Sequence, residues 1–273
     1  MTQPIQITKL LPRSLCMLIA AAGICLAATA PAAPNAQKLN DLLQRTGNQT
    51  AAFLDQFSDV KCTEHVRQEK FSKEDKVELK EESIYDYMAI LTNANGELNL
   101  SESRLAVHEA KRDRRNTSML LSNGFATLFL VFHPYYAEAF KFTLDGEEVI
   151  AGRSLERVKF QHVVGMKSPA ALALRGREYP LELSGTAWID PESGSIARIE
   201  AGIQDTLQDV GLKSLHSEIV FAPLPFSDSK TVYWFPTQAT VDVQTPRQHW
   251  RNLHRFTEYK KFSVTTEEKV ASK

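Results

Sequence analysis

Cysteine is scarce in this sequence, which has only 3 cysteines in 273 residues. Cys16 and Cys25 lie near the amino terminus, inside a segment that has the layout of an export signal. Once that segment is removed, Cys62 is the one cysteine left, and a single cysteine cannot form an internal disulfide bond. The sequence therefore excludes a small disulfide-stabilised fold, and it predicts a free, buried thiol at Cys62.

An excess of charge of one sign is also missing. The chain has 32 basic and 33 acidic residues and a formal net charge of -1 at pH 7. Nucleic-acid-binding proteins usually carry a basic surplus, so this balance indicates no nucleic-acid partner. Charged residues make up 24% of the chain and hydrophobic residues 43%, which is typical of a globular protein with an ordinary core.

Catalytic signatures are incomplete. His108 and Glu109 begin a zinc-protease helix motif, but Arg112 stands where the second histidine is required. Ser227 and Lys230 have the Ser-x-x-Lys spacing of penicillin-recognising enzymes, but they lie in a loop bounded by prolines and lack the accompanying motifs. No glycine-rich phosphate loop is visible. We therefore expect a protein that is not an enzyme and has no cofactor.

A metal site is equally disfavoured by spacing. Cys62, Glu64 and His65 are close in sequence, but on a strand Cys62 and Glu64 share one face while His65 points away. Three ligands on two faces cannot surround one ion. His249 and His254 have the same difficulty, so we expect no metal.

The first 33 residues have the layout of a secretory signal peptide. Lys9 and Arg13 precede an apolar run over 15–28, and small residues follow it up to Ala33. This predicts export to the periplasm or association with the outer membrane. The alternative is an uncleaved signal that anchors the chain in the inner membrane, because the run is nearly long enough to span a bilayer. We expect a single β-rich domain over 34–264 and a polar tail over 265–273.

A hairpin over 179–203 is the clearest structural signal. Apolar residues alternate with polar ones in both arms, as in an antiparallel sheet with one packed face. Between the arms lies Asp190-Pro191-Glu192-Ser193-Gly194, which supplies a side-chain acceptor, a fixed φ angle and a residue that accepts positive φ. The spacing predicts two strands joined by this turn.

Two other segments have the spacing of helices. Residues 36–57 keep one apolar face at helical spacing, formed by Leu39, Leu42, Leu43, Phe53, Leu54 and Phe57. Residues 119–142 are the most apolar stretch of the mature chain, but Gly124 and Pro134 interrupt them, which favours one helix or two short ones buried against the sheet over a membrane span. Most of the remaining chain alternates with period two. The predicted fold is mainly β with helices (α+β): a strongly curved antiparallel sheet or incomplete β-barrel of about ten strands, with both helical segments on its concave face.

This order of elements resembles the bacterial outer-membrane lipoprotein-sorting and lipoprotein-carrier-like superfamily. The motifs that carry the resemblance are Gly185-Thr186-Ala187-Trp188-Ile189-Asp190, the turn with Gly194, and the closing Tyr259-Lys260-Lys261-Phe262. The resemblance implies an incomplete β-barrel whose helices fill the concave side. It also implies a non-enzymatic periplasmic protein that holds an acyl chain, lipid or lipoprotein between sheet and helix. No single position matches the carrier's cavity arginine, so no binding residue is transferred.

Under this interpretation the apolar segment lines the cavity, and we expect its lining to include Leu128, Phe129, Val131 and Phe132. A basic cluster before it, formed by Lys111, Arg112, Arg114 and Arg115, would contact anionic lipid headgroups. The alternative is a structural or protein-interaction module of the cell envelope, with a filled core, no ligand and an envelope protein as its partner.

Overall fold

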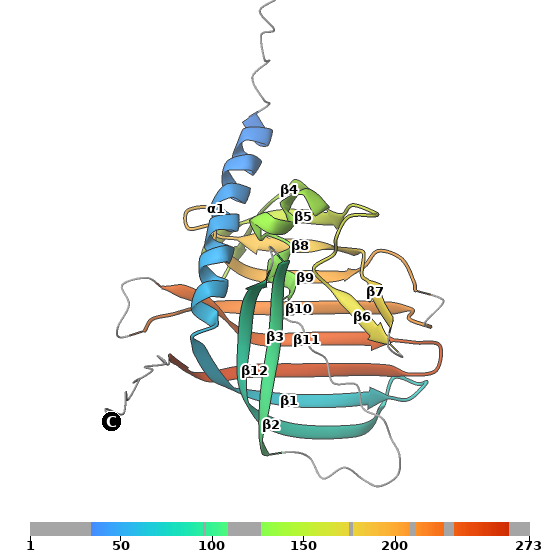
Figure 1. The fold of residues 1–273 in the computed structure, drawn as a ribbon. Helices are drawn as coiled ribbons and strands as arrows, with labels where there is room; N and C mark the ends of the chain where they lie inside the picture. Colours follow the sequence, from blue (N-terminus) through green and yellow to red (C-terminus); the bar gives the residue numbers. More distant parts are fainter. Residues whose placement is uncertain are drawn as a thin grey trace, which may run out of the picture.

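The computed structural model describes residues 34–94, 97–108, 127–174, 177–207, 211–226 and 232–261. The expected signal peptide over 1–33 and the polar tail over 265–273 lie outside these ranges, as does the basic cluster at 111–115. The described residues form one long helix, two short helical turns and twelve strands (Figure 1).

Helix α1, Pro34–Phe57, begins two residues before the predicted segment. Its buried residues recur three or four positions apart and therefore lie along one face: Leu42, Thr46, Thr50, Phe53, Leu54 and Phe57. The Thr46 hydroxyl donates to the Leu42 carbonyl oxygen at 2.9 Å, which satisfies a polar group on that face. Figure 1 shows α1 running across the strands of the sheet. None of the helices in the described ranges is long and apolar enough to cross a membrane.

Ten strands form one antiparallel sheet in the order β3-β2-β1-β12-β11-β10-β9-β8-β5-β4. Because β1 pairs with β12, the first and last strands of the described chain lie side by side within the sheet. Among the described residues β3 and β4 are the two edge strands and do not pair with each other, so the barrel is incomplete, as predicted. The strands are β1 Val60–Phe71, β2 Val77–Ala94, β3 Glu97–His108, β4 Phe140–Ile150, β5 Arg153–His162, β8 Leu183–Ile189, β9 Ile196–Ile203, β10 Ser214–Leu224, β11 Tyr233–Gln244 and β12 His249–Lys261.

A separate two-stranded sheet joins β6, Ala171–Leu174, to β7, Arg177–Pro180. The β2–β3 hairpin also departs from the main strand direction. β2 pairs with β1 only up to Met88, whereas its pairing with β3 continues to Ala94. In Figure 1 the end of β2 and all of β3 stand across the other strands, on the same side as α1.

The predicted hairpin is present as β8 and β9. The Asp190 carboxylate accepts from the backbone N–H groups of Glu192 at 3.1 Å and Ser193 at 2.9 Å, and Gly194 has a φ of 75°. The alternation predicts Ala197 on the apolar face and Trp188 packed on Ile196, and both expectations are corrected. A register shift lies between Trp188 and Ile189, so that Ile196 packs in the main core and Ala197 packs with Trp188 in a small second cluster.

The described part of the apolar segment begins at residue 127, so 119–126 lie outside the described residues, and Phe140–Ile150 form β4. Between them the chain forms two short turns, one of the two predicted arrangements. These are α2, Thr127–Leu130, and a 3-10 helix η1, Pro134–Ala139. Pro134 occupies the first turn of η1, where its missing N–H costs nothing, and the His133 side chain accepts from the Tyr135 backbone N–H at 3.2 Å. Both turns contribute buried residues to the core between α1 and the sheet.

Candidate functional site

The apolar segment lies at the centre of the interior. Leu128, Phe129, Val131 and Phe132 are all at most 4% exposed, and they belong to one cluster with residues of α1 and the sheet. The Phe129 ring stacks on Phe53 of α1 with 4.7 Å between ring centroids, and it meets Phe221 of β10 edge-on at 4.3 Å. The sheet, the helix and this segment therefore meet in an aromatic core.

This segment is held in place mainly by the packing of its side chains, and less by backbone hydrogen bonds. Its backbone hydrogen bonds around α2 are local, from Val131, Phe132 and His133 to carbonyls three residues earlier at 3.3, 2.9 and 3.1 Å. The α2 turn belongs to neither sheet. Such an element is a good candidate for a part that an apolar ligand could displace, because moving it breaks apolar contacts but no sheet hydrogen bond.

The interior beside Phe129 is filled in this structure. The pocket between α1 and the sheet that Phe53, Phe129 and Trp234 line has a volume of about 10 Å³. That volume holds one water molecule at most. Leu128, Phe129, Val131 and Phe132, the expected lining of the cavity, are buried here, and their role as a lining stays a prediction. An acyl chain would fit in this interior only if the segment around α2 moved away.

A buried charged cluster lies deeper in the same interior. Glu64 of β1 is fully buried, and the Arg104 side chain of edge strand β3 is 9% exposed. Arg104 donates from Nε to Glu64 Oε2 at 2.5 Å and from Nη2 to Oε1 at 2.9 Å, the two-pronged geometry that gives arginine–carboxylate pairs their strength. Nδ1 of His254 on β12 lies 2.8 Å from Glu64 Oε1. Because an ionised carboxylate only accepts, Nδ1 carries the proton in this contact.

A second carboxylate completes the buried cluster. Glu102 accepts from Nη1 of Arg104 at 3.1 Å and from the Tyr87 hydroxyl at 3.0 Å. The Arg104 guanidinium also lies 5.0 Å from the centre of the Tyr87 ring. These contacts tie β3 to β1 across the intervening strand β2, and so they fix the hairpin that crosses the open face.

The cluster sets the charge of its members. Burial alone raises the pKa of the Glu64 carboxyl, but the hydrogen bonds from His254 and Arg104 outweigh it and hold that pKa below its ordinary value. Burial alone lowers the pKa of Arg104, and its interactions with Glu64 reverse that effect and raise it. Burial raises the pKa of the Cys62 thiol, two residues along β1, to about 12, so that thiol is free, buried and unreactive near neutral pH.

Sequence reasoning placed Cys62 and Glu64 on one strand face with His65 on the other, and the burial of β1 agrees. It missed the cluster itself. The available signal was a glutamate at a position where the alternation of Val60, Cys62 and Val66 demands an apolar residue, because a buried charge requires a partner. Within the described ranges, no group of three or more His, Cys, Asp or Glu residues could hold a metal ion.

Among the residues that the structure describes, His162 is a buried polar side chain without a hydrogen-bond partner. His162 ends β5 at 4% exposure, and neither ring nitrogen makes a hydrogen bond. Its ring meets Phe140 edge-on at 5.2 Å, directly after η1. Burying an imidazole without a hydrogen-bond partner costs free energy. A polar group of a ligand that bonded to His162 would therefore stabilise the structure.

Glu64 should make the free energy of unfolding depend on pH in acid. Its folded pKa is lowered, so its stabilising effect is complete above the unfolded pKa of about 4.3 and is lost as the pH falls through the lower folded value. We expect Glu64→Gln to make the free energy of unfolding less dependent on pH below about pH 4.3. Urea titrations over a pH series measure this. Glu192→Gln in the exposed hairpin turn should keep the wild-type slope, and equal slopes for all three proteins would contradict the assignment.

No protein-family model matches the chain, and no curated protein sequence matches it. Solved structures do resemble its fold. A DUF1329 family protein from Desulfovibrio piger is 10% identical, with a TM-score of 0.46, over 85% of this chain and 95% of that one. A domain named for outer-membrane lipoprotein sorting, from Vibrio parahaemolyticus, is 9% identical, with a TM-score of 0.44, over 82% and 94%. A LolA superfamily protein from Nitrosomonas europaea is 8% identical, with a TM-score of 0.37, over 83% and 94%. The sequence resemblance to the lipoprotein-carrier-like superfamily and these structural similarities point the same way. The function is argued below from this chain's own residues.

Proposed function

We propose that this protein is a non-enzymatic, exported protein of the cell envelope that holds an acyl chain, of a lipid or a lipoprotein, between its curved sheet and the segment around α2. The observation that carries the proposal is the segment Leu128–Phe132. It is almost wholly buried and apolar, and it fills the concave face without joining the sheet. An acyl chain that displaced it would find the same aromatic surroundings.

Two other features support this proposal. His162 offers unpaired ring nitrogens at one end of the interior, where a polar group of the ligand could bind. The Glu64–Arg104 pair fixes the β2–β3 hairpin across the open face. This hairpin would therefore keep its position when the segment around α2 moves. The predicted headgroup contacts at Lys111, Arg112, Arg114 and Arg115 remain part of the proposal, outside the described residues.

The second candidate is a protein-interaction module of the envelope with a permanently filled core. A specific observation favours it. Edge strand β3 presents Leu105, 70% exposed, and Val107, 63% exposed, beside a free strand edge. Exposed apolar residues at a free edge are suited to strand addition by a partner. This candidate predicts an envelope protein as the partner and no bound lipid.

Truncating the displaceable segment should separate the two candidates. We expect Phe129→Ala to lower the free energy of unfolding by about 3–5 kcal/mol, because it leaves a cavity beside Phe53 and Phe221. If the interior accepts an acyl chain, added palmitate should recover part of that loss and raise the melting temperature of the variant more than that of the wild type. Thermal melts with and without palmitate measure both effects.

Phe71→Ala is the matched control. Phe71 is an aromatic residue at the end of β1 that stacks on His249, outside the interior cluster. Its melting temperature should respond to palmitate no more than that of the wild type. If palmitate stabilises neither the wild type nor Phe129→Ala, the acyl-binding proposal fails and the interaction module is favoured.

A further inference from the structure

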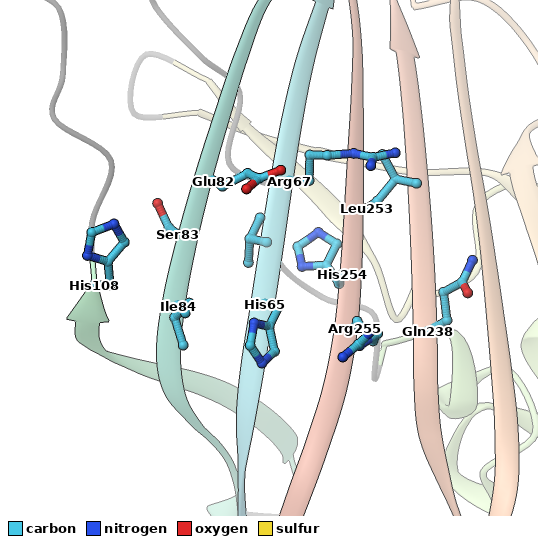
Figure 2. A pocket seen from close by; sticks show the side chains of 11 residues that line it. His65, Arg67, Glu82, Ser83, Ile84, His108, Gln238, Leu253, His254 and Arg255 are labelled. Atoms are coloured by element: carbon cyan, nitrogen blue, oxygen red, sulfur yellow. The ribbon is translucent and has the colours of Figure 1, made fainter.

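A groove of about 480 Å³ lies on the sheet away from the interior site (Figure 2). Residues from the five neighbouring strands β3, β2, β1, β12 and β11 line it, among them His65 and Arg67 of β1, Ile84 of β2, and Leu253 and Arg255 of β12. Its size is that of a site for a small ligand. None of these residues entered the predicted site.

Strand alternation places these side chains on the outer face. Glu64, Val66 and His254 are buried in the interior, so the residues between them, His65 and Arg255, point the other way. The exposure of Arg255 agrees with this. Val66, Ser83 and His254, which are buried on the interior side, also border the groove, so only the sheet itself separates the groove from the buried cluster.

The register concentrates positive charge at one point of the groove. His65 lies directly opposite Arg255, and Arg67 is the next residue of β1 on the same face, diagonal to Arg255. Directly opposed side chains in a sheet have Cβ atoms about 5 Å apart, and diagonal neighbours lie within reach of long side chains. Figure 2 shows His65 and Arg255 side by side on adjacent strands. Their basic groups can therefore converge on one small ligand.

Acidic residues compensate this charge only in part. Arg67 has Glu69 at 3.1 Å, and Glu82 lies opposite it on β2. In the part of the chain that the structure describes, Arg255 and His65 have no acidic partner. Placing basic groups opposite each other without a counter-ion costs stability, and a bound anion would relieve that cost.

We propose that this groove binds a small soluble phosphomonoester, with the phosphate held by Arg255, Arg67 and His65. Guanidinium groups bind phosphate oxygens through paired hydrogen bonds, and the imidazole supplies a further donor. The groove is larger than a phosphate group, and Ile84 and Leu253 give its remaining wall an apolar character that suits the organic part of the ligand. Glu82, Glu69 and Asp86 share this face, and Glu82 lines the groove. An anionic bilayer would bring many headgroups against these carboxylates, whereas a small soluble ester places one phosphate at the basic groups, which favours a soluble ligand over a membrane surface.

Isothermal titration calorimetry of the full protein with glycerol 3-phosphate tests this. We expect saturable binding that Arg255→Gln weakens about tenfold or more, the effect of losing a charge-assisted contact. Arg247→Gln removes an exposed arginine from the turn between β11 and β12, outside the groove, and should leave the affinity unchanged. Thermal melts of both variants check that they are folded.

Three results would overturn the proposal. The first is an absence of saturable binding at millimolar glycerol 3-phosphate. The second is an equal affinity of Arg255→Gln and the wild type. The third is binding to vesicles that contain phosphatidic acid, but not to those of phosphatidylcholine alone, together with no binding of the soluble ester, which would assign the groove to a lipid headgroup.

Discussion

Replacing Arg104 with alanine should lower the free energy of unfolding by about 3–5 kcal/mol. The expected loss is large because Arg104 is the cation between two buried carboxylates. Without it Glu64, which is fully buried, keeps only His254 as a partner, and Glu102 keeps only the Tyr87 hydroxyl among these contacts. Removing one member of a buried ion pair leaves an uncompensated charge, which costs far more than the pair itself contributes. Urea unfolding at neutral pH, followed by circular dichroism, measures the loss.

Lys80→Ala provides the comparison for this prediction. Lys80 pairs with Glu82 at 2.7 Å, but both side chains are about half exposed or more, at 48% and 66%. Surface pairs contribute about 0–1 kcal/mol, so this variant should unfold nearly as the wild type does. A loss of less than about 1 kcal/mol in Arg104→Ala would contradict a structural role for the buried cluster.

Adding one methyl group at Gly185 should be equally damaging. A Cβ at this position would lie 1.9 Å from the Glu200 carbonyl oxygen and 2.7 Å from the Phe160 ring, on the strands to either side. Rotation of a side chain cannot relieve a clash with a backbone oxygen, so β8 and β9 would have to separate. We expect Gly185→Ala to lose at least about 3 kcal/mol, at the upper end for overpacked sites. Thermal and urea unfolding measure this loss.

Gly146→Ala separates steric clash from backbone strain. Gly146 has a φ of 95°, which an alanine rarely adopts, but a Cβ there meets nothing within 4 Å. Its expected cost is about 1 kcal/mol. If Gly185→Ala lost no more stability than Gly146→Ala, the predicted clash between β8 and β9 at position 185 would be contradicted.

Features set by local chemistry could be predicted from the sequence. The turn at Asp190 and Gly194 depends on residues that are neighbours in the chain, so its signal is contained in five positions. The apolar face of α1 and the alternation of β8 and β9 come from spacing alone, and α1 and β9 were predicted with nearly the observed limits. The first arm of the hairpin was predicted from 179, but β8 begins at Leu183 because Tyr179 and Pro180 pair with β6. The two misplaced residues, Ile196 and Ala197, lie at a bulge that alternation cannot indicate.

The buried cluster and the outer groove could not be predicted in this way. Glu64 and Arg104 are 40 positions apart, and Glu64 and His254 are 190 apart, so only the pairing of β1 with β12 and the crossing of β3 bring them together. Arg104 also lies in β3, whose sequence ELNLSESRLAVH is polar and alternates only weakly. Likewise, Arg255 faces His65 only because the last strand of the chain pairs with the first.

The central claim is that the interior holds an acyl chain, and mass spectrometry of an organic extract tests it most directly. The mature protein would be purified from its native envelope without detergent, extracted, and compared with Phe71→Ala prepared in the same way. We expect an acyl lipid in stoichiometric amount in both extracts, because Phe71 lies outside the interior cluster. An extract that contains no lipid, and still contains none after labelled fatty acid has been offered, would contradict the claim and leave a protein-interaction module of the envelope as the better account.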